Sequence, residues 1–336
     1  MRIRLKQLRD QVIVITGASS GIGLTTAEMA AERGARVVLN ARNESDLRDA
    51  VERINQHGGR ATYVAGDVAD DETMDLLAQR AVDEFGALDT WVNNAGIGLY
   101  GRLEDVSMGD KRRLFDVNFW GVVNGCKAAV RTMRQQGGGA IINIGSVESE
   151  RALPLHGIYS ASKHAVKAYT DALRMELEAD GVPIAVTLVK PASINTPFTE
   201  HARNYMSQEA EYMPPVYAPE EVARTILKCA EKPTRDILVG GSGKMISLME
   251  KVAPRTMDRY LERSGFTQQQ KNEPLHTGDA LYGPESDGRR RGQTTHTTME
   301  RSTYTRAAMS DAVRLIPVIA FGAVLTGAVR SIRKSG

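Results

Sequence analysis

Near its start, the chain passes from a short apolar stretch directly into a glycine-rich turn. Residues 12–15 are apolar and β-branched, which is typical of a buried strand. The turn at 16–23 reads TGASSGIG, and a helical pattern follows it to about Arg33. Glycines let a backbone approach a pyrophosphate closely, and a helix N-terminus favours its negative charge. A glycine turn alone also fits an ordinary tight turn, but its place after the first strand favours a phosphate-binding unit.

Strands and helices alternate along the chain to about residue 240. After the first strand, apolar runs predict strands at 36–40, 61–65, a fourth ending near 93, and then 139–145, 183–189 and 235–239. Helical patterns occupy 108–135, 157–180 and 219–231. This alternation predicts an α/β fold with a Rossmann-like, doubly wound parallel sheet of about seven strands. Ligands of such sheets bind beyond the carboxyl ends of the strands.

The end of the second predicted strand bears on the cofactor. In a dinucleotide-binding fold, an Asp or Glu there bonds the 2′-hydroxyl of NAD, whereas an Arg nearby suits the 2′-phosphate of NADP. This chain has Asn40-Ala41-Arg42-Asn43, with no carboxylate. A guanidinium grips a phosphate through paired hydrogen bonds. The segment therefore predicts NADP(H), with NAD(H) as the alternative cofactor and a solvated arginine without a ligand as the alternative reading.

A second group of residues indicates proton transfer. Tyr159 and Lys163 are four positions apart in a predicted helix, so their side chains lie on one face. A nearby ammonium favours the phenolate and lowers a tyrosine pKa from its reference of about 10. Ser146 follows a predicted strand, and its hydroxyl can bond a carbonyl oxygen as charge builds there. Taken alone, the YxxxK spacing also fits an ordinary amphipathic helix.

With these motifs in place, the chain resembles the classical short-chain dehydrogenase/reductase family. The matches follow the family's order over roughly residues 10 to 250: TGASSGIG at 16–23, Asp67, NNAG at 93–96, Asn118 in DVNFWG, Ser146, and YSASK at 159–163. Each motif is weak by itself, but the set in this order is specific. The resemblance implies the fold, the reaction and the roles of individual residues.

The resemblance assigns Tyr159 as the acid/base and Ser146 as the group that orients and polarises the substrate carbonyl. Lys163 would bind the nicotinamide ribose and lower the tyrosine pKa, and Asn118 would hold a water in a proton relay from Lys163 to solvent. The residues implied at the cofactor are Gly17, Ser19, Ser20, Gly21, Ile22, Gly23, Arg42, Asp67, Val68, Asn94, Ala95, Gly96, Tyr159, Lys163, Pro191, Ile194 and Thr196.

One position departs from the family pattern. Ala192 stands where the family commonly has a glycine, and alanine disfavours positive φ. The loop from Pro191 to Thr196 is therefore expected to follow a slightly different path.

The predicted function is that of an NADP(H)-dependent oxidoreductase that interconverts an alcohol and a ketone or aldehyde by hydride transfer. Loops 147–158 and 197–217 are expected to border the substrate. The aromatic and methionine content of the second loop favours a lid over an apolar substrate, or else a loop that packs its own apolar side chains. His156 would lie at the pocket mouth. The alternatives are a non-catalytic NADP-binding protein and a membrane-tethered scaffold on the same fold.

Composition narrows the function classes. The formal net charge of +2 gives no general attraction to nucleic acid. Cys126 and Cys229 lie far apart and outside any CxxC motif, so buried free thiols in a reducing compartment are expected. The histidines are scattered, and no metal is expected. The basic N-terminus lacks an apolar stretch of signal-peptide type, which predicts a cytoplasmic catalytic domain, with attachment to the inner face of a membrane left open.

Three parts are expected along the chain: a catalytic domain at 8–264 that ends in a helix from 241, a polar, weakly ordered linker at 265–311, and an apolar helix at 312–333. Residues 315–329 carry no charge and have basic flanks. A bilayer span takes about twenty residues. A membrane anchor or interfacial helix, an apolar arm docked on protein, and a disordered tail therefore all stay open. The resemblance also implies a homodimer or homotetramer, paired through helices 108–135 and 157–180.

Overall fold

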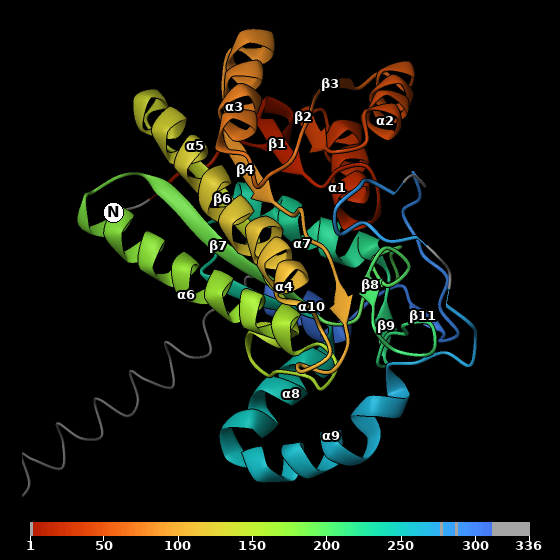
Figure 1. The fold of residues 1–336 in the computed structure, drawn as a ribbon. Coiled ribbons are helices and arrows are strands. Elements are labelled where there is room, and N and C mark those ends of the chain that lie inside the picture. The colour runs from red at the N-terminus through yellow and green to blue at the C-terminus, as the bar shows by residue number, and fades with distance from the viewer. Residues whose placement is uncertain (1–2, 276–277, 286–287, 311–336) are drawn as a thin grey trace, which may run out of the picture.

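The computed structural model describes residues 3–275, 278–285 and 288–310, and a parallel sheet of seven strands lies at their centre (Figure 1). The spatial order of its strands is β10-β7-β6-β4-β1-β2-β3. Their bounds are β1 Val12–Thr16, β2 Arg36–Ala41, β3 Arg60–Ala65, β4 Thr90–Asn93, β6 Gly139–Ile144, β7 Ile184–Pro191 and β10 Asp236–Val239. The order reverses between β1 and β4, so their carboxyl ends flank the crevice where such sheets bind ligands. The doubly wound sheet predicted from the sequence is confirmed.

Helices cover both faces of the sheet (Figure 1). One face carries α1 (Gly21–Glu32), α2 (Glu44–Gln56) and α7 (Pro219–Glu231), and the other carries α3 (Asp71–Phe85), α5 (Gly121–Gln136) and α6 (Gly157–Ala179). Each face buries its own apolar core. Strand β1 contributes to both cores because its side chains alternate: Ile13 and Ile15 join one, and Val12 and Val14 join the other.

Two predicted helices differ from the observed ones. The helix predicted at 108–135 consists of α4 (Met108–Phe115), a π-helical turn at Asp116–Trp120, and α5. The helix predicted at 241–264 divides into α8 (Gly241–Val252) and α9 (Pro254–Gln268), so it continues past 264. Pro254 explains the break, because proline lacks an N–H and the residue before it avoids the helical region. Ala253 accordingly has a φ of −144°.

The stretch expected as a weakly ordered linker instead packs against the catalytic domain wherever it is described. Residues 278–285 and 288–302, here called the strap, include the trace that passes beside α1 (blue in Figure 1). Strand β11 (Thr298–Met299) pairs with β9 (Val216–Tyr217), and α10 (Thr303–Met309) follows. Leu281 is fully buried in the apolar core. The sequence conceals this packing because most of the contacts are polar and have no periodicity.

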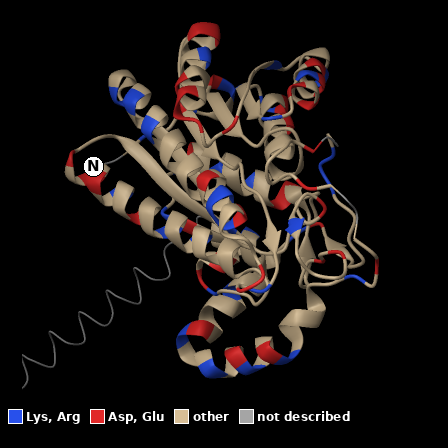
Figure 2. Ribbon diagram, in the orientation of Figure 1, with Lys and Arg blue, Asp and Glu red and all other residues tan. Residues whose placement is uncertain are grey.

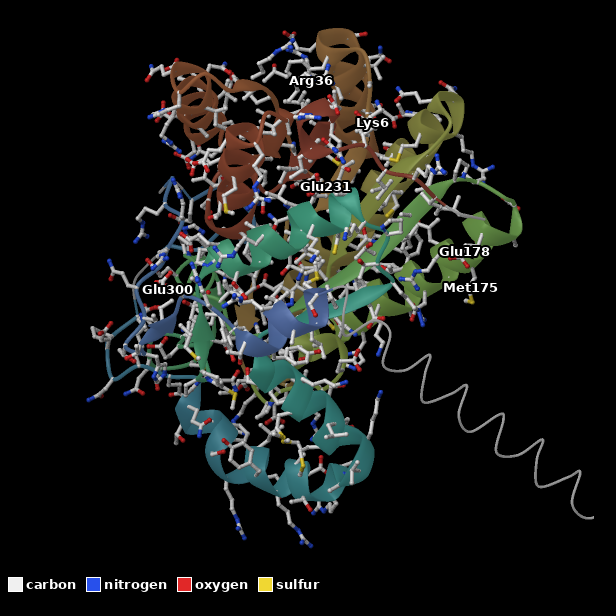
Figure 3. The ribbon with its side chains drawn as sticks, turned by 180° about the vertical axis from the view of Figure 1, so that it is seen from behind. Lys6, Arg36, Met175, Glu178, Glu231 and Glu300 are labelled. Carbon is white, nitrogen blue, oxygen red and sulfur yellow. The ribbon has the colours of Figure 1, made fainter. Side chains whose placement is uncertain are left out.

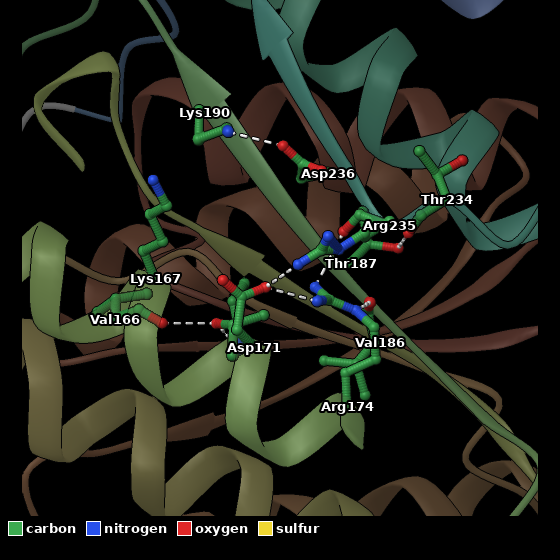
Figure 4. A network of polar contacts seen from close by, with 12 residues as sticks. Val166, Lys167, Asp171, Arg174, Val186, Thr187, Lys190, Thr234, Arg235 and Asp236 are labelled. Carbon is green, nitrogen blue, oxygen red and sulfur yellow. Dashed lines mark hydrogen bonds and ion pairs between the residues drawn. The ribbon is translucent and has the colours of Figure 1, made fainter. Parts of the chain in front are cut away.

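A polar network fixes α6 against β7 and β10 (Figure 4). Arg174 of α6 donates to the Val186 carbonyl at 2.9 Å and pairs with Asp171 at 2.6 Å. Asp171 also pairs with Arg235, at 3.0 Å, just before β10. Because α6 carries Tyr159 and Lys163, this network helps to set the position of both side chains over the sheet.

The opposite, N-terminal edge of the sheet is closed by other polar contacts (Figure 3). Lys6 pairs with Asp89 at 2.6 Å, and Arg36 donates to the Phe85 carbonyl at 3.2 Å. The amide of Leu8, in the short 3-10 turn Leu8–Asp10, donates to Glu231 at 3.1 Å. The carboxyl edge is therefore the one left for a binding site.

Several further predictions concern the chain as a whole. Cys126 and Cys229 are buried and are not joined in a disulfide, as expected. Charged residues of both signs are spread along the helices and loops (Figure 2). No group of three or more metal-ligating side chains, and no helix suited to crossing a bilayer, occurs in the described part of the chain. The apolar run 315–329 lies outside the described residues, so its three readings stay predictions.

Candidate active site

A cavity of about 520 Å³ opens at the carboxyl edge of the sheet, within the range typical of small-molecule sites. One end is lined by the glycine turn and the end of β2, and the other by residues around β6 and α6. It is lined by these residues from the predicted set: Gly17, Ser19, Ser20, Gly21, Ile22, Arg42, Asp67, Val68, Asn94, Ala95, Gly96, Ser146, Tyr159, Lys163, Pro191, Ile194 and Thr196. Gly23 and Asn118 are not among the lining residues.

The glycine turn places the N-terminus of α1 at the cavity. Gly17 and Gly21 have φ angles of +62° and +55°, which glycine adopts without strain. A Cβ at Gly23 would meet the Gly17 carbonyl oxygen at 2.1 Å, so the turn packs on the helix only with glycine there. Asn94, just after β4, holds the turn by donating to the carbonyls of Thr16 and Gly17 at 2.9 and 3.0 Å. This end of the cavity suits an anion.

Two arginines meet beyond the end of β2. Arg42 donates to the carbonyls of Ala280 and Leu281 in the strap, and burial lowers its pKa. Arg113 of α4 donates to the same Leu281 carbonyl at 3.0 Å and pairs with Asp67. Asp67 and Arg42 were predicted here, whereas Arg113 was missed because it belongs to a distant helix with no motif around it. Two guanidinium groups side by side suit a phosphate.

Ser146, Tyr159 and Lys163 come together at the end of β6, and all three are buried. Ser146 caps the short 3-10 turn Val147–Ser149, and its side chain hydrogen-bonds with that of Tyr159. Lys163 lies one turn after Tyr159 in α6, with Nζ 5.5 Å from the centre of the Tyr159 ring. The lysine donates to the Ile144 carbonyl at 3.0 Å. The predicted triad therefore shares one end of the cavity.

Burial dominates the protonation of Tyr159 and Lys163. It raises the pKa of Tyr159 above its usual range, the charge of Glu148 raises it further, and the hydrogen bond with Ser146 opposes both. Burial lowers the pKa of Lys163 to about 8, against the effect of Glu148. The sequence argument expects Lys163 to lower the tyrosine pKa, but the net shift is upward because desolvation of the phenolate prevails. Tyr159 therefore keeps its proton near neutral pH.

Asn118 lies in the π-helical turn, a feature often found at functional sites. Its side chain accepts from the Ile97 amide at 2.8 Å and donates to the Ile97 carbonyl at 3.0 Å. A Cβ at Gly96 would lie 3.4 Å from Asn118 Oδ1 and 3.7 Å from Lys163 Nζ. The asparagine and the lysine thus approach each other across a glycine.

Tyr159 is one end of a stack of three aromatic rings. His156 lies between Tyr100 and Tyr159, with ring centres 4.2 and 4.3 Å away. Its Nδ1 contacts Glu148 at 2.9 Å, and the same carboxylate accepts from Ser160 at 2.5 Å. The stack fixes the plane of the Tyr159 ring. His156 was expected at the pocket mouth and is instead only 3% exposed. Tyr100 lies in strand β5 (Leu99–Tyr100), which pairs with β8 (Arg203–Asn204).

Apolar side chains border the cavity beside the triad. The two expected substrate loops contribute to it, with Leu153 from the first and Phe198 and Tyr212 from the second. Tyr205 of the second loop is not part of the cavity lining, and its hydroxyl donates to Asp110 at 2.7 Å. Ala192 does not adopt positive φ. Helices α8 and α9 add residues that the sequence did not assign to the site: Met245, Ile246, Met257, Tyr260 and Leu261.

Comparisons with known proteins agree with this geometry. The chain is 42% identical over 310 residues to the uncharacterized oxidoreductase YxnA of Bacillus subtilis, covering 91% of this chain and 87% of that protein. It is 37% identical over 194 residues to the 3-ketodihydrosphingosine reductase of Bacteroides thetaiotaomicron, covering 58% of this chain and 68% of that protein. L-sorbose reductase from Gluconobacter frateurii, solved with NADPH and L-sorbose, has a TM-score of 0.62 and 28% identity, covering 72% of this chain and 98% of that one.

The family assignment rests on the part of the chain that builds six of the seven sheet strands and most of the cavity lining. The family model for short chain dehydrogenases matches residues 11–207, which is more than half of the chain and includes the glycine turn, Ser146, Tyr159 and Lys163. The chain therefore belongs to the short-chain dehydrogenase family of nicotinamide-dependent oxidoreductases.

Proposed function

We propose that this oxidoreductase uses NADP(H) to interconvert an apolar ketone or aldehyde and its alcohol, with Tyr159 as the proton donor. The observation that carries the proposal is one cavity that joins the glycine turn to Ser146, Tyr159 and Lys163. A non-catalytic scaffold on the same fold would have no use for a phenol and an ammonium buried side by side. Such perturbed groups in a cleft are characteristic of catalytic sites.

The cavity residues fit a dinucleotide. The N-terminus of α1 suits the pyrophosphate, and the pair Arg42 and Arg113 suits a further phosphate beyond β2. The segment from Asn94 to Gly96, just after β4, also lines the cavity, and β4 lies in the sheet between β1, which leads into the glycine turn, and β6, which leads to Ser146. When bound, the nicotinamide supplies hydride to a carbonyl carbon or takes it from an alcohol.

The chain's own residues then handle the proton. Ser146 Oγ bonds the substrate oxygen and stabilises the negative charge that develops on it. The Tyr159 hydroxyl gives its proton to that oxygen in reduction and takes it back in oxidation. The Lys163 ammonium stabilises the phenolate that remains, and Asn118 lies beyond Lys163 on the route by which the proton is restored. Since burial keeps the phenol protonated, the site is prepared for reduction at neutral pH.

Two features support NADP(H) over NAD(H). The end of β2 has no carboxylate for a ribose 2′-hydroxyl, and the Asn40 side chain is used to hold β3, donating to the Val64 and Gly66 carbonyls at 3.0 and 3.2 Å. Arg42 lies in the cavity lining with Arg113 beside it. The sorbose reductase that this chain resembles was solved with NADPH.

The substrate is proposed from the lining, because the relatives named above differ in substrate, one being a 3-ketodihydrosphingosine reductase and the other an L-sorbose reductase. Leu153, Phe198 and Met257 represent the apolar surface near the triad. The test is NADPH oxidation by the purified protein against ketones and aldehydes graded by chain length and polarity. We expect kcat/KM to rise with apolar chain length. Turnover of polyhydroxylated ketones alone would overturn the substrate class, and no turnover of any carbonyl would overturn the function.

The rate of reduction should fall as the pH rises through about 8, the pKa of Lys163. Below that pH the lysine is charged, and above it the lysine is neutral and no longer stabilises a phenolate. Tyr159 does not limit this range, because burial raises its pKa. The measurement is kcat/KM for NADPH against pH, which reports the groups of the free enzyme. A flat profile up to pH 10 would contradict the role given to Lys163.

The oligomeric state remains a proposal. The face of α6 turned away from the site carries Ala168 and Met175, and Met175 is 63% exposed (Figure 3). Trp120, at the end of the π-helical turn, is 52% exposed. Ala165, Ala172 and Leu173 are half-buried on α6. Small and apolar side chains of this kind suit close helix packing, so we propose a homodimer through α5 and α6.

A further inference from the structure

The strap reaches the part of the cavity where the phosphates are proposed to bind. Its residues Ala280, Pro284 and Glu285 line the cavity together with Gly21 and Arg42. The amide of Gly21, at the first position of α1, donates to the carbonyl of Arg289 in the strap at 2.9 Å. The strap is therefore in direct contact with the glycine turn.

One end of the strap is anchored beyond β2. The Leu281 side chain is fully buried, and its carbonyl accepts from both Arg42 and Arg113. The Ala280 amide donates to the His201 carbonyl at 2.8 Å. Tyr282 donates to Asp110 at 2.9 Å. These contacts tie the strap to the same arginines that are proposed to hold a phosphate.

The middle of the strap lies against α1, and this part of the strap carries basic residues, drawn in blue in Figure 2. Arg290 pairs at 2.5 Å with Glu28, whose side chain is only 8% exposed. Arg289 and Arg291 pair with Glu200 and Glu220 at 2.8 and 3.0 Å. The three arginines thus join the strap to α1, to the loop after Thr196 and to α7.

The far end of the strap closes against the loop that carries Thr196. A Cβ added at Gly292 would meet the Thr196 carbonyl oxygen at 2.2 Å and Glu200 Oε1 at 2.6 Å. The Gln293 amide donates to Glu200 at 2.7 Å, and Glu211 accepts from Thr295 at 2.7 Å. The strap therefore spans the site from the arginines, past the glycine turn, to the proposed nicotinamide end.

We propose that the strap is the outer wall of the cofactor site, and that NADP(H) enters and leaves only when the strap lifts away from α1. This inference rests on the proposed function. The strap borders the cavity without filling it, since Ala280, Pro284 and Glu285 belong to the lining of a cavity of about 520 Å³. Most of its contacts with the catalytic domain are hydrogen bonds and ion pairs, which can break and form again. The family match ends at residue 207, so the strap is an addition to the matched region.

The test compares two glycines of the strap. At Gly292→Ala the new methyl group collides with the Thr196 carbonyl, whereas at Gly283→Ala it meets nothing within 4 Å. Neither glycine has positive φ, so alanine is not strained at either place. Stopped-flow fluorescence measures NADPH association and dissociation. Trypsin cleavage after Arg289, Arg290 and Arg291, whose side chains are 40 to 44% exposed, measures the position of the strap.

We expect NADPH to protect the three arginines of the unmodified protein from trypsin. Gly292→Ala should speed both NADPH dissociation and cleavage of the free protein by about tenfold, as overpacking by roughly 1.4 kcal/mol implies. Gly283→Ala should behave like the unmodified protein. These readouts need no turnover, so they separate the strap from the reaction.

Three results would overturn the inference. In the first, NADPH binds but gives no protection. In the second, Gly292→Ala leaves the rates of NADPH dissociation and of trypsin cleavage unchanged. In the third, Gly292→Ala alters NADPH binding without altering cleavage, which would place the change at Thr196 rather than in the strap. Carbonyl reduction would still support the proposed function in each case. If no nicotinamide dinucleotide binds, both proposals fail.

Discussion

Replacing Tyr159 with phenylalanine should lower kcat at least about 10²-fold, the usual effect of removing a general acid. Phenylalanine keeps the ring that stacks on His156, with ring centres 4.3 Å apart, and removes only the hydroxyl that bonds Ser146. NADPH affinity should change little, because Lys163 and the glycine turn are untouched. Steady-state kinetics with a carbonyl substrate and a fluorescence titration with NADPH measure the two quantities.

The matched control is Tyr169→Phe, which removes a hydroxyl from the same helix outside the cavity lining. The Tyr169 ring packs edge-on against Phe119 at 6.1 Å, and that contact needs no hydroxyl. This variant should keep the turnover of the unmodified protein. Near-normal turnover by Tyr159→Phe would sink the assigned mechanism, and equal losses in the two variants would indicate damage to α6 rather than loss of a proton donor.

The sheet and most of the site were predictable because their signals are local. A parallel strand buried on both faces must be apolar along its length, as Val12–Thr16 largely is, and a glycine turn must follow where the backbone bends towards a phosphate. Tyr159 and Lys163 share a helix face by spacing alone. Ser146, Tyr159 and Lys163 could thus be selected from short stretches of sequence, and the family resemblance indicated that these stretches belong to one site.

Other parts of the site depend on contacts between segments that are distant in the chain, and such contacts produce no periodic pattern in the sequence. Arg113 reaches Asp67 from another helix, and Glu148 meets His156 across a turn. The strap is held by carbonyl oxygens and ion pairs, and only Leu281 among its residues is fully buried. A polar sequence with scattered glycines predicts a linker whether or not the segment packs against the domain. The reason is that every residue offers the same backbone carbonyl acceptor, so contacts made through carbonyls leave no mark in the sequence.

The upward shift of the tyrosine pKa has the same origin. Spacing puts an ammonium near Tyr159, and this predicts a lower pKa. Spacing does not reveal that His156 and Phe198 pack against the Tyr159 ring, with Tyr100 stacked on the far side of His156. Enclosure by these rings makes desolvation the largest effect, with Glu148 adding to it. A charge partner can be inferred from sequence, whereas the degree of enclosure depends on the packed fold.

Combining Arg42→Gln with Ala41→Asp should shift the cofactor preference from NADP towards NAD. Arg42→Gln removes charge-assisted hydrogen bonds worth roughly 1.5–3 kcal/mol, or about 10- to 150-fold in NADP affinity. Both positions line the cavity, so a carboxylate at 41 would meet the ribose directly, bonding its 2′-hydroxyl in NAD and repelling the 2′-phosphate of NADP. Dissociation constants for the four dinucleotides, by titration, measure the change.

The ratio of the two affinities is the informative quantity, because Arg42 has a second task. It donates to the strap carbonyls of Ala280 and Leu281, so its loss also loosens the wall over the cofactor. That effect weakens NAD and NADP alike and cancels in the ratio, which leaves only the contribution of the 2′-phosphate. The control Arg48→Gln removes an exposed arginine of α2 that pairs with Glu44 at 3.7 Å, and it should leave the ratio unchanged. If the unmodified protein binds NAD and NADP equally, or if the double variant keeps the original ratio, then Arg42 serves the strap and not the cofactor phosphate.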